Sequence, residues 1–278
     1  MRFSKYQGIG NDFVMLADPG DSVRLEPDLV RRLCDRRFGI GGDGVIRVAP
    51  GSGGADLFMD YVNSDGSVGE MCGNGIRCLA LFAREEGMTA ATELSVGTRA
   101  GLKKVWVQGA GRVRVDMGAP IFAPAEVPVR WDGPDALHAK IDLDEGVLEA
   151  TCLSMGNPHA VLFVDDPATS PVSTVGPLIE VHPMFPNRTN VEFARVDSPD
   201  HVSMRVWERG SGETLACGTG AAAVAVAARV VRGAAEVLTV ALPGGDLEIE
   251  WAGSIDVSEP LFMTGPAIKS FQGEIDIP

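Results

Sequence analysis

Two apolar runs with helical spacing, each introduced by a cysteine, dominate the hydrophobic pattern of this chain. The first follows Cys72, repeats apolar residues at intervals of three and four, and stops at Gly87. The second follows Cys217 and is apolar all round from Gly220 to Val231, which predicts a buried central helix. Since Gly-X-Gly comes directly after both cysteines, the sequence predicts a thiol at the N-terminus of a helix, twice.

The two cysteine motifs belong to a longer repeat. Four landmarks recur at an offset of 145 or 146 residues: Cys72 and Cys217, Asn11 and Asn157, Asn63 and Glu208, and Gly44 and Asn190. A steady offset across most of the chain indicates a duplicated structural unit.

The remaining pattern is mostly that of short strands separated by turns. We expect strands near residues 13–16, 45–48, 57–62, 103–108, 112–117, 160–164, 191–193 and 202–207, with more between 127 and 154. Further helices are expected from Pro27 to a stop at Gly39 and over residues 173–181. This mixture predicts an α+β fold with mixed or antiparallel sheet.

Several conspicuous residues have purely structural interpretations. Residues 39–44 match G-x-G-x-x-G, but a helix precedes them and a strand follows, which is the reverse of a dinucleotide-binding loop. The helix after Cys72 is expected to turn its charged residues to solvent: Arg77, Arg84, Glu85 and Glu86. The other cysteines are expected to be buried: Cys34, Cys78 and Cys152.

Composition narrows the class of protein. The chain has 278 residues, 45% of them hydrophobic, enough for two domains with separate cores. Its formal net charge of −14 argues against nucleic acid as a partner, because phosphate binding favours a basic face. The N-terminus has no apolar signal core, and the longest apolar run is too short to span a bilayer, so we expect a cytoplasmic protein without a membrane partner.

The cysteine count and spacing argue against a disulfide framework and against zinc. Five cysteines is an odd number, there is no C-x-x-C, and no histidine lies near Cys72 at ligand spacing. The two cysteines at helix starts are better suited to acid/base chemistry. A helix N-terminus carries partial positive charge and unpaired N–H groups, which favour a thiolate and also bind a carboxylate.

The chain resembles the diaminopimelate epimerases in five ordered motifs that together span nearly all of it. They are residues 8–14, 63–67, 71–75, 156–159, and 208–220 with its Cys-Gly-Thr-Gly. The resemblance implies an α+β fold of two pseudo-symmetric domains, each a mixed or antiparallel sheet rolled around a central helix. We expect an N-terminal domain of residues 1–117, joined by the tail 263–278, and a C-terminal domain of residues 118–262, with the active site in the cleft between them.

The resemblance also implies the activity and the site. It implies epimerisation of LL-diaminopimelate to the meso isomer without a cofactor, for lysine and peptidoglycan synthesis, by a homodimer. The catalytic residues would be Cys72 and Cys217, assisted by His159 and Glu208. The substrate would be bound by these residues: Asn11, Asn63, Gly73, Asn74, Asn157, Asn190, Glu208, Arg209, Gly218 and Thr219. Some family members carry glutamine at the position of Gly44, so a contact made there would need another source.

Two thiols suit this reaction for a physical reason. Inverting an amino-acid stereocentre without a cofactor requires a base on one face of the carbon and an acid on the other. A cysteine near a helix N-terminus can titrate close to neutral pH, and two such groups titrate as a coupled pair. Helix N–H groups would stabilise the charge that develops on the carboxylate.

Three alternatives remain open from the sequence. A proline or hydroxyproline racemase would use the same thiols, but it would need neither Glu208-Arg209 nor the asparagines. A thiol redox protein would use Cys72 and Cys217 as a reversible disulfide. A non-catalytic amino-acid-binding module would need neither thiol.

Overall fold

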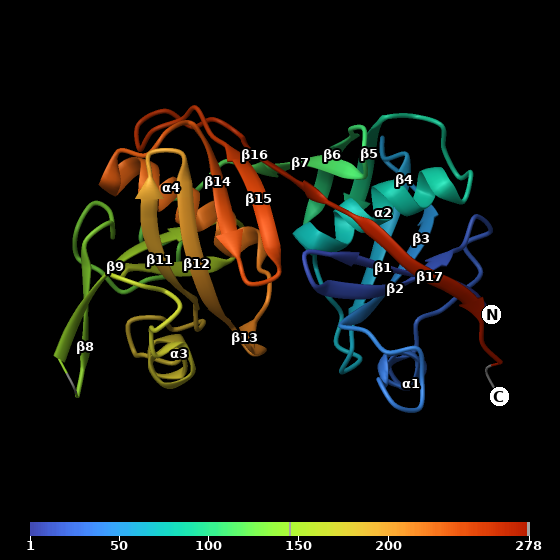
Figure 1. Ribbon diagram of the computed structural model, residues 1–278, viewed down its shortest axis with the longest axis horizontal. Coiled ribbons are helices and arrows are strands. Elements are labelled where there is room, and N and C mark those ends of the chain that lie inside the picture. The colour runs from blue at the N-terminus through green and yellow to red at the C-terminus, as the bar shows by residue number, and fades with distance from the viewer. Residues whose placement is uncertain (145, 277–278) are drawn as a thin grey trace. The chain divides into compact units, whose positions relative to one another are not determined.

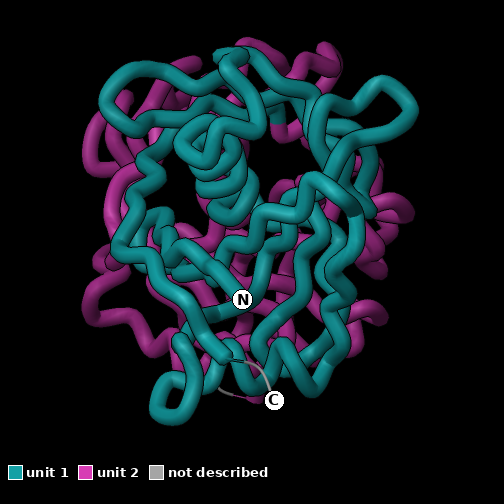
Figure 2. Tube along the Cα trace, turned by 90° about the vertical axis from the view of Figure 1, so that its right-hand side faces the viewer, with its two compact units in different colours: residues 1–116, 264–278 teal, residues 117–263 magenta. Residues whose placement is uncertain are grey.

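The computed structural model describes residues 1–144 and 146–276. The chain divides into two compact units (Figure 2). Unit 1 comprises residues 1–116 together with residues 264 onward, and unit 2 comprises residues 117–263. Among the described residues, none of the helices combines the length and the apolarity that a bilayer crossing requires.

Unit 1 is a mixed sheet with two helices in its connections. Its strands, in sheet order, are β17 (Ile268–Glu274), β1 (Arg2–Gly8), β2 (Asn11–Ala17), β3 (Gly44–Pro50), β4 (Leu57–Asn63), β5 (Glu93–Thr98), β6 (Gly101–Val107) and β7 (Arg112–Gly118). The pairs β2–β3 and β4–β5 are parallel and the others are antiparallel. The parallel crossovers contain α1 (Pro27–Cys34) and α2 (Gly73–Glu85).

Unit 2 repeats this arrangement. Its strands, in sheet order, are β8 (Ala139–Leu143), β9 (Gly146–Ser154), β10 (Pro158–Phe163), β11 (Asn190–Ser198), β12 (His201–Glu208), β14 (Val237–Leu242) and β15 (Gly245–Glu250), with β13 (Gly212–Thr214) also beside β12. The parallel pairs are β10–β11 and β12–β14, and their crossovers contain α3 (Val172–Glu180) and α4 (Gly218–Arg232). The chain then passes from unit 2 into unit 1 through β16 (Leu261–Pro266).

The strand register confirms the predicted duplication. Phe13 pairs with Gly44 in unit 1, and His159 pairs with Asn190 in unit 2. The next strands pair Val45 with Val62 and Val191 with Trp207. Every one of these positions recurs at the offset seen in the sequence, so the α+β class and the pseudo-symmetry of the halves are both confirmed.

Each unit is built around the helix that follows its cysteine. In unit 1, α2 packs against β1, β2, β3, β6 and β17, and in unit 2, α4 packs against β9 to β12, β14 and β15 (Figure 1). Helix α4 is rich in alanine, which favours helix and lets strands approach closely, and its residues 220–228 are all buried. Gly233 ends α4 in the left-handed conformation, with φ of 71°. The cysteine of each motif therefore starts an enclosed helix.

Two details of the expected helices are wrong. Helix α1 ends at Cys34 rather than at Gly39, because the Asp35 carboxylate accepts the N–H groups of Arg37 and Phe38 and folds the chain into a turn. Arg77 is fully buried rather than solvated, since strands cover α2 on the side where the sequence pattern left a polar residue.

The structure also has strands that the pattern did not indicate. Strand β1 pairs with both β2 and β17, and β5 pairs with both β4 and β6. Residues 127–138, where strands were expected, form turns and irregular backbone, whereas β8 and β9 begin afterwards.

Candidate active site

Cys72 is the N-cap residue of α2. Its backbone is extended, with φ of −139° and ψ of 118°, and its Sγ accepts the N–H of Gly75 at 3.4 Å. The Asn11 Oδ1 lies 3.6 Å from the same sulfur and accepts a hydrogen bond from Asn74 Nδ2 at 3.3 Å. Asn11 is held in turn by Asp43, whose carboxylate accepts its Nδ2 at 2.6 Å. The structure thus brings together Asn11, Cys72 and Asn74 at one partly exposed helix end.

Cys217 occupies the same position on α4. Its φ is −123° and its ψ is 112°, and its Sγ accepts the N–H of Gly220 at 3.3 Å. Thr219 Oγ1 lies 3.5 Å from the sulfur and accepts Asn157 Nδ2 at 3.3 Å. The prediction of a thiol at two helix N-termini is confirmed. Gly73 and Asn74 in one unit and Gly218 and Thr219 in the other supply first-turn N–H groups, which a helix leaves without internal acceptors.

A buried carboxylate that the sequence analysis missed lies beside Cys217. Glu192 Oε1 lies 2.6 Å from His159 Nδ1, and both side chains are inaccessible to solvent. His159 Nε2 lies 3.0 Å from Asn157 Oδ1, so the pair joins the cluster around Thr219. Burial raises the pKa of Glu192, and the charge of His159 opposes this. The available signal was a glutamate between Val191 and Phe193 in an apolar strand.

The surroundings of Cys217 favour its protonated form. Burial is the largest cause that raises the pKa of this thiol well above its usual value, followed by the charges of Glu208 and Glu192. Hydrogen bonds from Thr219 and from the Gly220 N–H act in the opposite direction. This helix end therefore combines a proton donor with groups that can bind an anion.

The remaining predicted residues lie at strand ends within each unit. Asn63 ends β4 and accepts the Tyr61 hydroxyl at 2.6 Å. In unit 2, Asn190 begins β11, donates to Pro158 O at 2.8 Å and accepts the Arg209 backbone N–H at 2.9 Å. The side chain of Arg209 reaches Asn187 O at 3.2 Å, and the residue is exposed.

Glu208 and Gly44 have defined local settings. Glu208 ends β12 and accepts a hydrogen bond from the Thr214 hydroxyl. Gly44 begins β3, and a Cβ placed there would lie 2.6 Å from the Tyr61 ring and 2.7 Å from Val62 O. The glycine is therefore required by packing, and neighbouring groups must supply any contact that a side chain would make there.

The other thiols are separated from this chemistry by burial. Cys34, Cys78 and Cys152 are buried, and burial raises the pKa of each to about 12. All five cysteines are free. Within the described ranges, His, Cys, Asp and Glu side chains form no group of three or more that could hold a metal ion.

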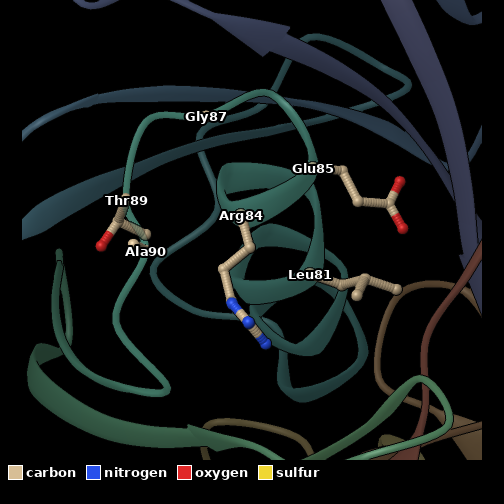
Figure 3. Close-up of a pocket in the computed structure, with 6 residues that line it drawn as sticks. All are labelled: Leu81, Arg84, Glu85, Gly87, Thr89 and Ala90. Atoms are coloured by element: carbon tan, nitrogen blue, oxygen red, sulfur yellow. The ribbon is translucent and has the colours of Figure 1, made fainter.

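A surface pocket of about 530 Å³ lies at the other end of α2 (Figure 3). It is lined by Leu81, Arg84, Glu85, Gly87, Thr89 and Ala90. These residues include none of the predicted site residues. The thirteen residues of α2 separate the two helix ends by roughly 18 Å, at about 1.5 Å per residue.

The sequence comparisons cover almost the whole chain. The family model described as diaminopimelate epimerase matches residues 3–123 and 151–270. A diaminopimelate epimerase of Moorella thermoacetica is 48% identical over 100% of both chains. One from Synechococcus elongatus is 47% identical over 100% of this chain and 99% of its own length.

Solved structures with low identity share the fold. A probable proline racemase from Agrobacterium radiobacter has a TM-score of 0.71 at 18% identity, covering 100% of this chain and 93% of its own. A phenazine biosynthesis protein from Bacillus anthracis has a TM-score of 0.70, also at 18% identity, covering 100% and 99%. At this identity the likeness concerns the fold alone, whereas the family match and the relatives near 47% identity concern the whole sequence. The chain belongs to the diaminopimelate epimerase family.

Proposed function

We propose that this protein epimerises LL-diaminopimelate to meso-diaminopimelate, with Cys72 and Cys217 as the opposed acid and base. The observation that carries the proposal is the duplicated N-cap geometry, in which each sulfur accepts the N–H three residues ahead at 3.3 to 3.4 Å. The family membership of the whole chain supports the choice of substrate. In this proposal the two units face one substrate, and the site lies in the cleft between residues 1–117 with 263–278 and residues 118–262.

Each thiol serves one face of the α-carbon. One sulfur, as thiolate, removes the proton, and the other, as thiol, delivers a proton from the opposite side. The raised pKa of Cys217 suits it to the role of proton donor at rest. After a turnover the two sulfurs have exchanged protonation states, so the same site runs the reverse reaction.

The helix N-termini stabilise the charge that the reaction develops. Gly73 and Asn74 of α2 and Gly218 and Thr219 of α4 present backbone N–H groups to the carboxylate next to the reacting carbon. Asn11 contacts the sulfur of Cys72 and orients that thiol. Asn157 bonds to Thr219, the neighbour of Cys217, and orients the second thiol through it. His159 and Glu208 adjust the charge around Cys217, Glu208 directly through its charge and His159 through Glu192.

The distal end of the substrate carries a second carboxylate and an ammonium group. Arg209 can form two parallel hydrogen bonds to that carboxylate, and its backbone is fixed by Asn190 at 2.9 Å. Glu208 and the amide oxygens of Asn63 and Asn190 can accept from the ammonium. Proline lacks this second carboxylate and ammonium group, so a proline racemase would not need these side chains. Proline racemisation is therefore the weaker candidate function. The protein is proposed to act in the cytoplasm, as a homodimer.

Isotope incorporation tests the two-thiol mechanism. In heavy water without pyridoxal phosphate or metal, product formed early from either isomer should carry deuterium at the inverted carbon, because the donor thiol exchanges with solvent. Unreacted substrate should stay largely protiated. Cys72→Ala and Cys217→Ala should each abolish epimerisation. Full activity in either variant, or early product that retains the substrate proton, would contradict the mechanism, and proline turnover without diaminopimelate turnover would favour the racemase.

A further inference from the structure

Arg77 is an arginine with no solvent access beside the thiol end of α2. Its Nη1 donates to Gly73 O at 3.1 Å and its Nε donates to Pro266 O at 3.3 Å. Its Nη2 packs against Gly8, where an added Cβ would lie 3.0 Å away. Burial lowers the pKa of Arg77 to about 10, while the charges of Cys78 and Cys72 act to raise it. The guanidinium is therefore charged at neutral pH.

A cation at this position is unfavourable for the fold. Burial removes the hydration of the guanidinium, and the N-terminus of a helix already carries partial positive charge. Arg77 lies in the second turn of α2, so both effects raise the free energy of its charged guanidinium. A group of negative charge at the helix start would relieve them.

The contacts of Arg77 lead to the reacting end of α2. Gly73 O and the Asn74 N–H belong to the same peptide, so a charged donor on that oxygen polarises the N–H that faces the substrate carboxylate. Asn74 Nδ2 also donates to Asn11 Oδ1, the atom that accepts the S–H of Cys72 at 3.6 Å. Arg77 thus acts on both the anion site and the thiol.

Unit 2 has no equivalent cation at this place. At the offset of 145, the residue that corresponds to Arg77 is Ala222, which is fully buried. Gly75 and Gly220 are equivalent positions in the repeat, as are Ile46 and Glu192. A Cβ added to Gly75 would lie 2.7 Å from Ile46, whereas one added to Gly220 would lie 2.9 Å from Glu192 Oε1. The two thiols thus share a backbone geometry but have opposite charges beside them.

We propose that Arg77 is a positioning residue whose buried charge favours the thiolate of Cys72, against the Asn11 oxygen that accepts its S–H, and whose bond to Gly73 O strengthens the anion site at Asn74. This inference rests on the proposed function, in which Cys72 is one of the two acid/base groups. It assigns the resting base to unit 1 and the resting acid to unit 2.

The other charged groups on the elements around α2 are held in local interactions. On β1 and β2, Lys5 pairs with Asp12 at 2.8 Å, and Asp12 also binds Arg36. Five further groups are paired: Arg47 of β3 with Asp18 and Asp60, Lys103 of β6 with Asp116, Lys269 of β17 with Gln272 and Glu86, Arg2 with Glu86, and Tyr6 with Glu85. Lys104 of β6 and Glu274 of β17 are exposed to solvent. Asp43, which binds Asn11, is also paired with Arg36 at 2.9 Å. Cys78 is the other thiol near Arg77, and burial keeps it protonated.

The test measures the pH midpoint for alkylation of Cys72 by iodoacetamide, read by peptide mass spectrometry in a Cys217→Ala background. Arg77→Met and Arg77→Gln, two neutral variants of different polarity, should each raise the midpoint by about one unit or more. Arg77→Lys should keep it within about half a unit of the parent. Arg84→Met, near the far end of the same helix, is the matched control and should leave it unchanged.

The outcomes separate this inference from the proposed function. An unchanged Cys72 midpoint in either folded neutral variant, with folding judged by circular dichroism, would overturn the role of Arg77. In a Cys72→Ala background the Arg77→Met change should move the Cys217 midpoint by less than half as much, and an equal shift would also overturn the inference. Alkylation requires no turnover, so a shifted midpoint in a protein that does not epimerise diaminopimelate would support Arg77 while refuting the proposed reaction.

Discussion

Replacing Glu192 with glutamine should make Cys217 a more reactive thiol. Glu192 and His159 are fully buried and lie 2.6 Å apart. The charge of Glu192, after burial and the charge of Glu208, helps to raise the pKa of Cys217. Glutamine removes this charge, yet its amide oxygen can still accept a hydrogen bond from the imidazole. The substitution therefore tests charge with little change in shape.

The structure sets the size of the effect. A Cβ placed on Gly220 would lie 2.9 Å from Glu192 Oε1 and 3.3 Å from Cys217 Sγ, so these two atoms are no farther apart than the sum of those distances, 6.2 Å. Two unit charges at that separation interact by about 2.7 kcal/mol at an effective dielectric constant of about 20, equivalent to about two pKa units. His159 acts against the effect of burial on Glu192 and reduces this field, so the expected fall in the pKa of Cys217 is about one to two units.

Alkylation of Cys217 by iodoacetamide in a Cys72→Ala background measures this fall. At a pH below the pKa of Cys217 in both the parent and the variant, a fall of one pKa unit gives about tenfold more thiolate. The lower pKa also makes the thiolate a weaker nucleophile, so the alkylation rate rises by only about threefold per pKa unit. Glu192→Gln should thus accelerate alkylation by about threefold to tenfold. Cys34, Cys78 and Cys152 do not interfere, since burial raises the pKa of each to about 12.

Glu236→Gln is the matched control for this experiment. Glu236 pairs with Arg229 at 3.0 Å, close to the C-terminal end of α4, roughly 20 Å from Cys217 at about 1.5 Å per residue. Its removal should leave the alkylation rate unchanged. A Glu192→Gln rate equal to or below that of the parent would refute the electrostatic account of Cys217.

Three further predictions concern stability and substrate binding. Burial would raise the pKa of Asp18, but hydrogen bonds from backbone N–H groups and from Arg47 lower it from 3.8 to about 2. The charged Asp18 therefore stabilises the fold above its unfolded pKa, and this stabilisation is lost as the pH falls through about 2. Asp18→Asn should lower the free energy of unfolding, measured in urea, by about 2 kcal/mol at pH 7 and by about half as much at pH 3. Arg209→Lys keeps the charge but loses the planar fork, and kcat/KM for diaminopimelate should fall at least about tenfold; a value equal to the parent's would remove Arg209 from the site. Gly44→Ala forces a Cβ to within 2.6 Å of Tyr61 and should lower the free energy of unfolding by about 1 to 3 kcal/mol, and an unchanged urea midpoint would show that β3 adjusts.

The sequence was sufficient to predict the fold class, the duplication and the placement of both thiols. Gly-X-Gly after a cysteine is a local signal, and the position of each thiol depends only on the local backbone. Both sulfurs accept the N–H three residues ahead. The repeat was equally visible, because an offset in sequence becomes the same offset in strand register. Strands β1 and β5 were not predicted, because they are defined by the strands they pair with and not by a hydrophobic pattern of their own.

Two of the charges beside the thiols, those of Arg77 and Glu192, could not be predicted in this way, whereas Glu208 was named from the family resemblance. Helical periodicity assumes that the polar face of a helix meets solvent, so Arg77 was assigned to a surface that strands cover in the folded chain. Glu192 lies in a strand whose residues 190–194 are all buried, and a strand buried on both faces has no alternation that would single out one of its members. A charged residue inside an apolar strand was the one signal for Glu192, but only the packing of the folded chain shows which thiol each of the two charges lies beside.

Duplication accounts for the geometry of the site and divergence accounts for its charge. A duplicated unit with unchanged residues would give two thiols of equal pKa, and neither would favour the role of base in the proposed reaction. Substitution at three pairs of equivalent positions, Arg77 with Ala222, Ile46 with Glu192 and Asn63 with Glu208, places a cation near one sulfur and two carboxylates near the other. Because opposite charges move the two pKa values in opposite directions, one thiol can start as base and the other as acid without any change in the backbone that holds them.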